Sequence, residues 1–185
     1  MSAPRSTPTA GRTVQRPSGG DTRRILYVAD PSCVWCWRFA PVVRQIAASY
    51  GAAAPVAILL GRDDPLAAAV AAVRARAPDR ALAFLERVQR AVHAERREAW
   101  DDRALAALAG DVGLAPAALA AGDAAAARAA LAGDVALVAR LGVTGFPTLL
   151  LEDPRGYALL TAGCRSFERL APAVEAWIAD TAGAG

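Results

Sequence analysis

Two short apolar runs near the start of the chain predict buried strands on either side of a helix. The first run spans Ile25 to Ala29 and the second spans Val56 to Leu60, and each has the length of a strand rather than of a helix. Apolar residues recur with helical spacing between them until about Tyr50, and Gly51 is a typical helix stop. Because a helical crossover joins them, we expect the two strands to be parallel.

The middle of the chain, from about residue 64 to 141, is rich in alanine and has helical periodicity. Asp64-Pro65 and Asp101-Asp102 are typical helix starts, since an N-terminal helix turn favours Asp and Pro. Further starts are expected at Pro78-Asp79, Pro116 and Asp123, and helix ends near Gly110, Gly113, Gly122 and Gly133. Four or five short helices are predicted, without the fixed period of a repeat array.

Strand character returns after this helical block. Two apolar runs, Thr148 to Glu152 and Tyr157 to Leu160, flank the turn sequence Asp153-Pro154-Arg155-Gly156 and predict a hairpin. A closing helix carries its apolar face on Leu170, Val174, Trp177 and Ile178. The predicted class is α/β, in the order strand, helix, strand, helical block, hairpin and helix.

The composition favours one folded domain behind a polar leader. The chain has 185 residues, 55% of them hydrophobic, which is enough for a sizeable core. Residues 1–24 are rich in Ser, Thr, Pro, Gly and Arg and predict a disordered tail, which leaves residues 25–181 as the domain. Nothing before Ile25 resembles a secretory signal and no apolar stretch is long enough to span a membrane, so a cytoplasmic protein is expected.

The charge distribution argues against a nucleic-acid partner. The formal net charge is +3, but five arginines and one aspartate lie within residues 1–24 and the remainder is nearly neutral. Every basic residue is Arg, and the chain has neither Lys nor Asn, which is typical of codon bias in a GC-rich genome. A surface selected for phosphate contacts is therefore not expected.

The motif Cys33-Val34-Trp35-Cys36 follows the first strand at the start of the first helix. Ser32 is a usual N-cap residue, which would place Cys33 in the first helical turn near unpaired backbone N–H groups. Such a position lowers a thiol pKa, and the thiolate is the reactive form. Cys33 is thus the candidate nucleophile, and Cys36, one turn deeper on the same face, is the candidate resolving thiol.

A metal or haem role for the two cysteines is disfavoured. A closed zinc site needs four ligands, and only Cys164 and His93 remain to supply more, so we expect neither a metal nor another cofactor. A c-type haem would require His directly after Cys36, where Trp37 stands. His93 shares its predicted helical face with charged and amide side chains and is expected to be solvated. For Cys164 a small buried residue is favoured over a third redox thiol.

Three stretches carry a resemblance to the DsbA-like family of disulfide oxidoreductases, in particular its cytoplasmic branch of predicted disulfide isomerases. They are Asp30 to Pro41 around the CxxC, Gly142-Val143-Thr144-Gly145-Phe146-Pro147-Thr148, and Asp101 to Leu114. The resemblance covers about Ile25 to Asp180. It implies a thioredoxin-like fold with a helical insertion, at about residues 64–141, between the second strand and the strand after a cis-proline. It also implies thiol–disulfide oxidoreductase activity.

The resemblance and the residues themselves suggest roles for the side chains around the cysteines. Pro147 would be the cis-proline opposite the CxxC, and the backbone of Phe146 would pair with an extended partner over Cys33. Trp35, Trp37 and Phe39 are candidates for an apolar substrate rim around Cys33, with Trp35 expected at the surface and Phe39 expected in the core. Asp30 and Pro31 would support the site, with Asp30 either assisting proton transfer from Cys36 or capping the helix. The expected partners are protein or peptide thiols and disulfides, with glutathione as a further candidate.

Two departures from the family affect the expected chemistry. The segment from Leu60 to Arg97 is shorter than in relatives, and Val34-Trp35 lacks the His of strongly oxidising members, so a powerful oxidant is not favoured. Two alternatives stay open. One is a glutathione-dependent isomerase or transferase of the kappa type, and the other is a noncatalytic, redox-responsive binding protein.

Overall fold

The computed structural model describes residues 23–115, 119 and 124–182. Its elements, in chain order, are β1 (Arg24–Ala29), α1 (Val34–Tyr50), β2 (Val56–Leu60), α2 (Pro65–Arg76), a short 3₁₀ turn (Pro78–Arg80), α3 (Ala81–His93), α4 (Asp102–Asp111), α5 (Ala124–Arg140), β3 (Thr148–Asp153), β4 (Gly156–Ala162) and α6 (Phe167–Ala182). The tail prediction for residues 1–22 lies outside the described residues, and Arg24 already belongs to β1.

The four strands form one sheet in the order β2-β1-β3-β4. β1 and β2 are parallel, with Ile25 opposite Val56 and Ala29 opposite Leu60, as the strand, helix, strand pattern predicts. β3 is antiparallel to β1 and pairs with β4 in the predicted hairpin. The sheet therefore brings the end of β1, which leads into the CxxC, beside the start of β3.

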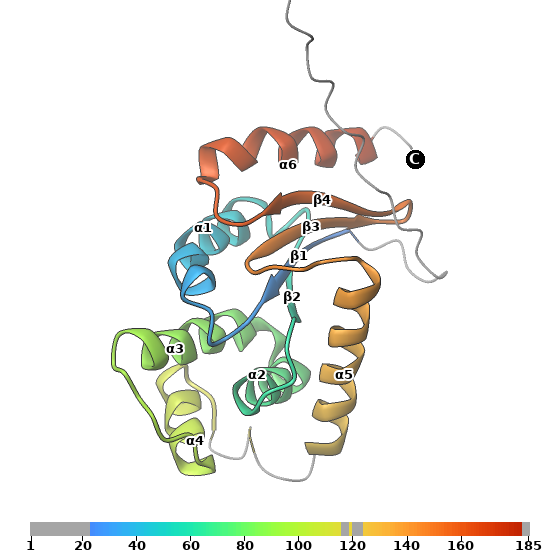
Figure 1. Ribbon diagram of the computed structural model, residues 1–185. Helices are drawn as coiled ribbons and strands as arrows, with labels where there is room; N and C mark the ends of the chain where they lie inside the picture. Colours follow the sequence, from blue (N-terminus) through green and yellow to red (C-terminus); the bar gives the residue numbers. More distant parts are fainter. Residues whose placement is uncertain (1–22, 116–118, 120–123, 183–185) are drawn as a thin grey trace, which may run out of the picture.

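Alternation along β1 divides the core into two layers, because successive strand side chains point to opposite faces. Tyr27 and its alternate neighbours belong to a cluster that includes residues of α1, α2, α3 and α6. Leu26 and Val28 face the other way, where they join Val138 of α5. Figure 1 shows α6 and α1 on one side of the sheet, with α5 running along the other.

The helical insertion between β2 and β3 begins where its capping residues predict. The Asp64 carboxylate accepts a hydrogen bond from the Ala67 N–H at 2.9 Å, and Asp101 does the same for Ala104 at 2.7 Å. Each satisfies an otherwise unpaired N–H of a first helical turn. In Figure 1 α2, α3 and α4 gather below the sheet and α5 leads back to β3.

One predicted helix boundary in the insertion is wrong. Gly133 does not end a helix but lies inside α5, with no atom within 4 Å of the place a Cβ would occupy. The alanines and leucines around it sustain the helix across the glycine, since one Gly costs only about 1 kcal/mol relative to Ala. The starts predicted at Pro116 and Asp123, and the stop at Gly122, lie outside the described residues.

A partly buried ion pair joins the insertion to the sheet. Asp134 of α5 accepts a hydrogen bond from the Leu60 N–H at 3.0 Å, and Arg74 of α2 donates to the Ile58 carbonyl at 2.6 Å. The same two side chains bind one another. The architecture is an α/β thioredoxin-like fold with a helical insertion between the second strand and the strand that follows Pro147, as predicted.

Candidate functional site: a CxxC helix facing a cis-proline

The turn before α1 places Cys33 at the very start of the helix. Cys33 is itself the N-cap, so the prediction that Ser32 caps the helix is wrong. Instead the Asp30 carboxylate accepts the Ser32 N–H at 2.7 Å, and the Asp30 carbonyl accepts the Cys33 N–H at 3.1 Å. Asp30 therefore shapes the turn, and the half-buried Cys33 side chain lies at the positive end of a 17-residue helix.

Cys36 lies one turn into α1 and is fully buried. Both Cys33 and Cys36 are free thiols, and they interact with one another. Burial raises the pKa of Cys36 well above its usual value, and the neighbouring Cys33 raises it further. The Tyr27 hydroxyl, also buried, donates to the Cys36 carbonyl at 3.2 Å. Cys36 is therefore held as a protonated thiol beneath the more accessible Cys33.

The loop before β3 faces Cys33, although the two are more than a hundred positions apart in the chain. The Phe146–Pro147 peptide bond is cis. The Cys33 thiol donates to the Phe146 carbonyl at 3.7 Å. The Pro147 carbonyl accepts the Gly163 N–H at 2.8 Å, which ties this loop to the end of β4. Pro147 is buried and Phe146 is half-buried, and the loop presents the Phe146 carbonyl to Cys33.

The predicted apolar rim is divided between surface and core. The Trp35 side chain is 55% exposed and Val34 is 42% exposed, so both lie on the surface at the helix tip. The Arg38 guanidinium lies 5.5 Å from the centre of the Trp35 ring, a cation–π arrangement. Phe39 is buried in the core, as expected.

The supporting residues Asp30 and Pro31 are both buried. The second carboxylate oxygen of Asp30 lies 3.6 Å from the Arg62 guanidinium, whose side chain is 66% exposed. Arg62 thus pairs with Asp30 beside the turn that carries Cys33. The Asp30 side chain does not cap α1, because the N–H that it accepts belongs to Ser32, the residue before the N-cap Cys33.

His93 is not the solvated residue that its sequence neighbours predict. Its ring stacks on Trp37, with centroids 5.3 Å apart and planes inclined by 20°. Its Nε2 atom is buried and has no hydrogen-bond partner among the described residues. Burial lowers the pKa of His93, whereas the Asp30 carboxylate and the Cys33 backbone act in the opposite direction. The polar face of α3 therefore packs against α1. The charged residues on this face had predicted a solvent-exposed surface instead.

Cys164 also differs from its predicted buried state. It is exposed, and its thiol donates to the Trp35 carbonyl at 3.5 Å. Partial burial raises the pKa of Cys164, and Cys33 contributes to the increase. The turn after β4 thus brings the third cysteine to the tip of α1, which its place in the sequence did not suggest.

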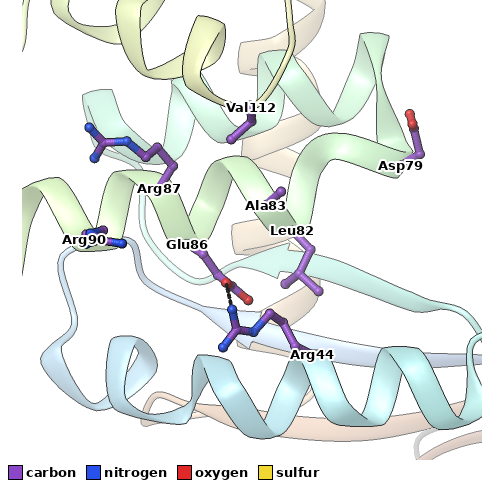
Figure 2. Close-up of a pocket in the computed structure, with 8 residues that line it drawn as sticks. All are labelled: Arg44, Asp79, Leu82, Ala83, Glu86, Arg87, Arg90 and Val112. Atoms are coloured by element: carbon purple, nitrogen blue, oxygen red, sulfur yellow. Dashed lines mark ion pairs between the residues drawn. The ribbon is translucent and has the colours of Figure 1, made fainter.

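A pocket of about 480 Å³ lies between α1 and α3, away from the cysteines. Figure 2 shows Arg44 of α1 pointing toward Glu86 of α3, with their charged groups 3.4 Å apart. Arg87, on the same helix, pairs with Glu95 and Asp111. The charges lining the pocket are thus largely paired within the protein, and none of the CxxC or cis-proline residues lines it.

The described residues include no group of three or more His, Cys, Asp and Glu side chains arranged to hold a metal ion. Within the same residues, none of the helices is both long and apolar enough to cross a membrane.

Several solved structures have the same fold at low sequence identity. The "putative protein disulfide isomerase" from Nitrosomonas europaea superposes with a TM-score of 0.79 at 23% identity, covering 86% of this chain and 98% of that one. The cytosolic disulfide reductase DsbM from Pseudomonas aeruginosa, solved with GSH, gives 0.64 at 24% identity, covering 85% and 96%. Reduced DsbA1 from Neisseria meningitidis gives 0.69 at 14% identity, covering 94% and 93%.

A search of curated proteins finds no match to the chain. The family model of the DSBA-like thioredoxin domain matches residues 59–175, which contain the helical insertion, the cis-proline loop and the hairpin. The matched region begins after the CxxC, so the family match does not depend on the two cysteines. The chain belongs to the DsbA-like thioredoxin domain family.

Proposed function

We propose that the protein is a thiol–disulfide oxidoreductase or isomerase in which Cys33 attacks and Cys36 resolves. The observation that carries this proposal is the position of the Cys33 thiol, at the N-terminus of α1 and 3.7 Å from the carbonyl that precedes the cis-proline. A helix N-terminus favours the anionic form of a thiol, and the thiolate is the nucleophile in disulfide exchange.

The first step forms a mixed disulfide. The Cys33 thiolate attacks one sulfur of a substrate disulfide, a Cys33–substrate S–S bond forms, and the other substrate sulfur leaves as a thiolate. The buried Cys36 then loses its proton and attacks Cys33 Sγ. This second exchange releases the substrate as a dithiol and leaves a Cys33–Cys36 disulfide, so two electrons pass from protein to substrate. The reverse sequence oxidises a substrate dithiol.

Phe146, Pro147 and Trp35 supply the proposed substrate surface. The Phe146 backbone would pair with an extended peptide beside Cys33, as backbone groups do when a strand is added to an edge. The exposed Trp35 ring would contact apolar substrate side chains. Asp30 and Pro31 would hold the turn that fixes Cys33 at the end of the helix.

Protein, peptide and small-molecule disulfides are the proposed substrates, and the cytoplasm is the proposed location. The structural likeness to a cytosolic reductase solved with GSH supports glutathione as one small-molecule partner. The absence of His between the cysteines supports reduction or isomerisation over strong oxidation.

Reduction of insulin by dithiothreitol, followed as turbidity, tests the proposal. The wild type and Cys164→Ser, which removes the thiol outside the motif, should accelerate precipitation, whereas Cys33→Ser should not. Cys36→Ser should instead accumulate mixed disulfides that mass spectrometry detects on Cys33. No acceleration by the wild type, or equal acceleration by Cys33→Ser, would contradict an oxidoreductase and favour a noncatalytic binding protein. Titration of the cysteine pair against glutathione then gives the direction of electron flow.

A further inference from the structure

The register between α1 and α3 brings His93 to the active-site end of α1. Two contacts define this register: Trp37 stacks on His93, and Arg44 pairs with Glu86. Arg44 lies seven positions after Trp37 on α1, whereas Glu86 lies seven positions before His93 on α3. The two helices are therefore antiparallel, and Figure 2 shows the end where Arg44 meets Glu86. His93 therefore lies against the residue that directly follows Cys36.

The His93 ring stacks on Trp37 and interacts with the Cys33 backbone, but one of its two ring nitrogens is unpaired. Its Nε2 atom is inaccessible to solvent and has no partner within the described residues. Buried polar atoms in folded proteins are usually paired, so an unpaired one calls for an explanation. A histidine whose ring packs well but whose nitrogen is unsatisfied is suited to respond to a charge that forms nearby.

The charged and polar groups around His93 come from three directions. The turn before α1 contributes the Asp30 carboxylate and the backbone of Cys33, both of which interact with the imidazole. Arg62 lies beyond Asp30 and pairs with it. The other charged side chains on the two packed helices and in the loop after α3 are Arg38 and Arg44 on α1, Glu86, Arg87 and Arg90 on α3, and Glu95, Arg96, Arg97, Glu98 and Asp101 in the loop. Arg44 pairs with Glu86, and Arg90 lies 4.0 Å from Glu95.

We propose that His93 is a positioning residue for the ionisation of Cys33. Its imidazolium form stabilises the Cys33 thiolate, and its neutral form withdraws that stabilisation. This inference rests on the proposed function, because it assigns a regulator to the same nucleophile. Because His93 is the last residue of α3, the helical insertion would then influence the ionisation of the CxxC nucleophile.

The two titrations are coupled, so each charge favours the other. In the dithiol state burial keeps the His93 pKa low. When Cys33 ionises, the new negative charge favours protonation of His93. Reduction of the Cys33–Cys36 disulfide at mildly acid pH then consumes two electrons and two protons: one proton on Cys36 and one on His93, with Cys33 left as thiolate. At higher pH His93 remains neutral, and the stabilisation of the reduced state falls.

The test measures Cys33 ionisation without any disulfide substrate. In a Cys164→Ala background, which removes the other accessible thiol, the rate of alkylation by iodoacetamide and the ultraviolet absorbance of the thiolate are recorded from about pH 5 to 9. His93→Phe keeps the stacked ring and removes both nitrogens. For each protein the alkylation rate at about pH 5.5 is divided by the rate at about pH 9. This ratio should be about tenfold lower in His93→Phe than in the parent, which corresponds to an increase of roughly one unit in the pKa of Cys33.

Two further variants make the outcome decisive. Arg90→Gln removes a charge from the same helix without touching the stack and should reproduce the parent profile. His93→Gln keeps a neutral polar side chain and should behave like His93→Phe, even if the latter folds poorly. A parental pH profile in either folded His93 variant would overturn the proposal. Since alkylation needs no disulfide exchange, a protein inactive toward insulin could still show the His93 effect, and the two failures are distinguishable.

Discussion

The Phe146 ring occupies the space in which a side chain at Gly61 would begin. A Cβ built on Gly61 would lie 2.1 Å from both Cε1 and Cζ of that ring. Gly61 directly follows β2, and its N–H donates to the Ala29 carbonyl at 3.0 Å, so its backbone is fixed by the sheet. The absence of a side chain at Gly61 therefore sets where Phe146 lies, and with it the carbonyl that faces Cys33.

Gly61→Ala should displace the Phe146 ring and lower both stability and activity. Overpacking of this kind costs about 1 to 3 kcal/mol of unfolding free energy, measurable by urea denaturation. Insulin reduction should fall as well, because the ring carries the loop beside Cys33. Gly110→Ala is the matched control, since no atom lies within 4 Å of a Cβ at that position. In a double-mutant cycle, Phe146→Ala should remove most of the cost; fully additive effects would refute the contact.

Gly133→Ala should stabilise the protein. Gly133 lies in the middle of α5 with open space around its missing side chain, so alanine adds helix propensity without a clash. The expected gain is about 0.5 to 1 kcal/mol in denaturant unfolding. A loss of stability would show that the helix is not continuous through this position.

Tyr27→Phe should cost about 0.5 to 1.5 kcal/mol, the net value of a buried hydrogen bond. It removes the hydroxyl that donates to the Cys36 carbonyl and leaves the ring in place. Tyr50→Phe is the matched control, because its hydroxyl bonds Glu175 at the exposed surface and its loss should change stability by less than about 0.5 kcal/mol. Equal losses in the two variants would contradict the buried bond.

Glu86→Gln should change stability in a pH-dependent way. Burial raises the pKa of Glu86, although Arg44 opposes the shift, so the folded protein holds this proton more tightly than the unfolded chain does. The cost of the charged form is absent below the unfolded pKa, near about 4.3, and grows as pH rises through the folded value. The variant should therefore melt at a higher temperature than the wild type at pH 7 and at a similar one at pH 4.

The exposed Glu98→Gln provides the control for this pH dependence, because it removes the same charge from the surface. If both variants raised the melting temperature equally at pH 7, the effect would come from net charge and not from the burial of Glu86.

The strands and the CxxC were predictable because they depend on local signals, whereas the cis-proline loop was expected from the resemblance to the family. Apolar runs of strand length gave β2 its observed ends, and the residues from Gly142 to Thr148 indicated the loop with the cis-proline. His93 was mispredicted for a different reason. Polar side chains on α3 are typical of a solvated face, and only the packing of α3 on α1 turns that face inward. The role of Gly61 likewise depends on Phe146, a residue far away in the sequence.

The bonds that Arg74 and Asp134 make to β2 also bear on self-association. β2 is an outer strand of the sheet, and such strands expose backbone groups to which another chain can add. Here the Ile58 carbonyl and the Leu60 N–H are already occupied by the two side chains, which also pair with one another. A second molecule would have to break an ion pair before extending the sheet at this edge. The insertion therefore hinders the addition of another strand at the β2 edge.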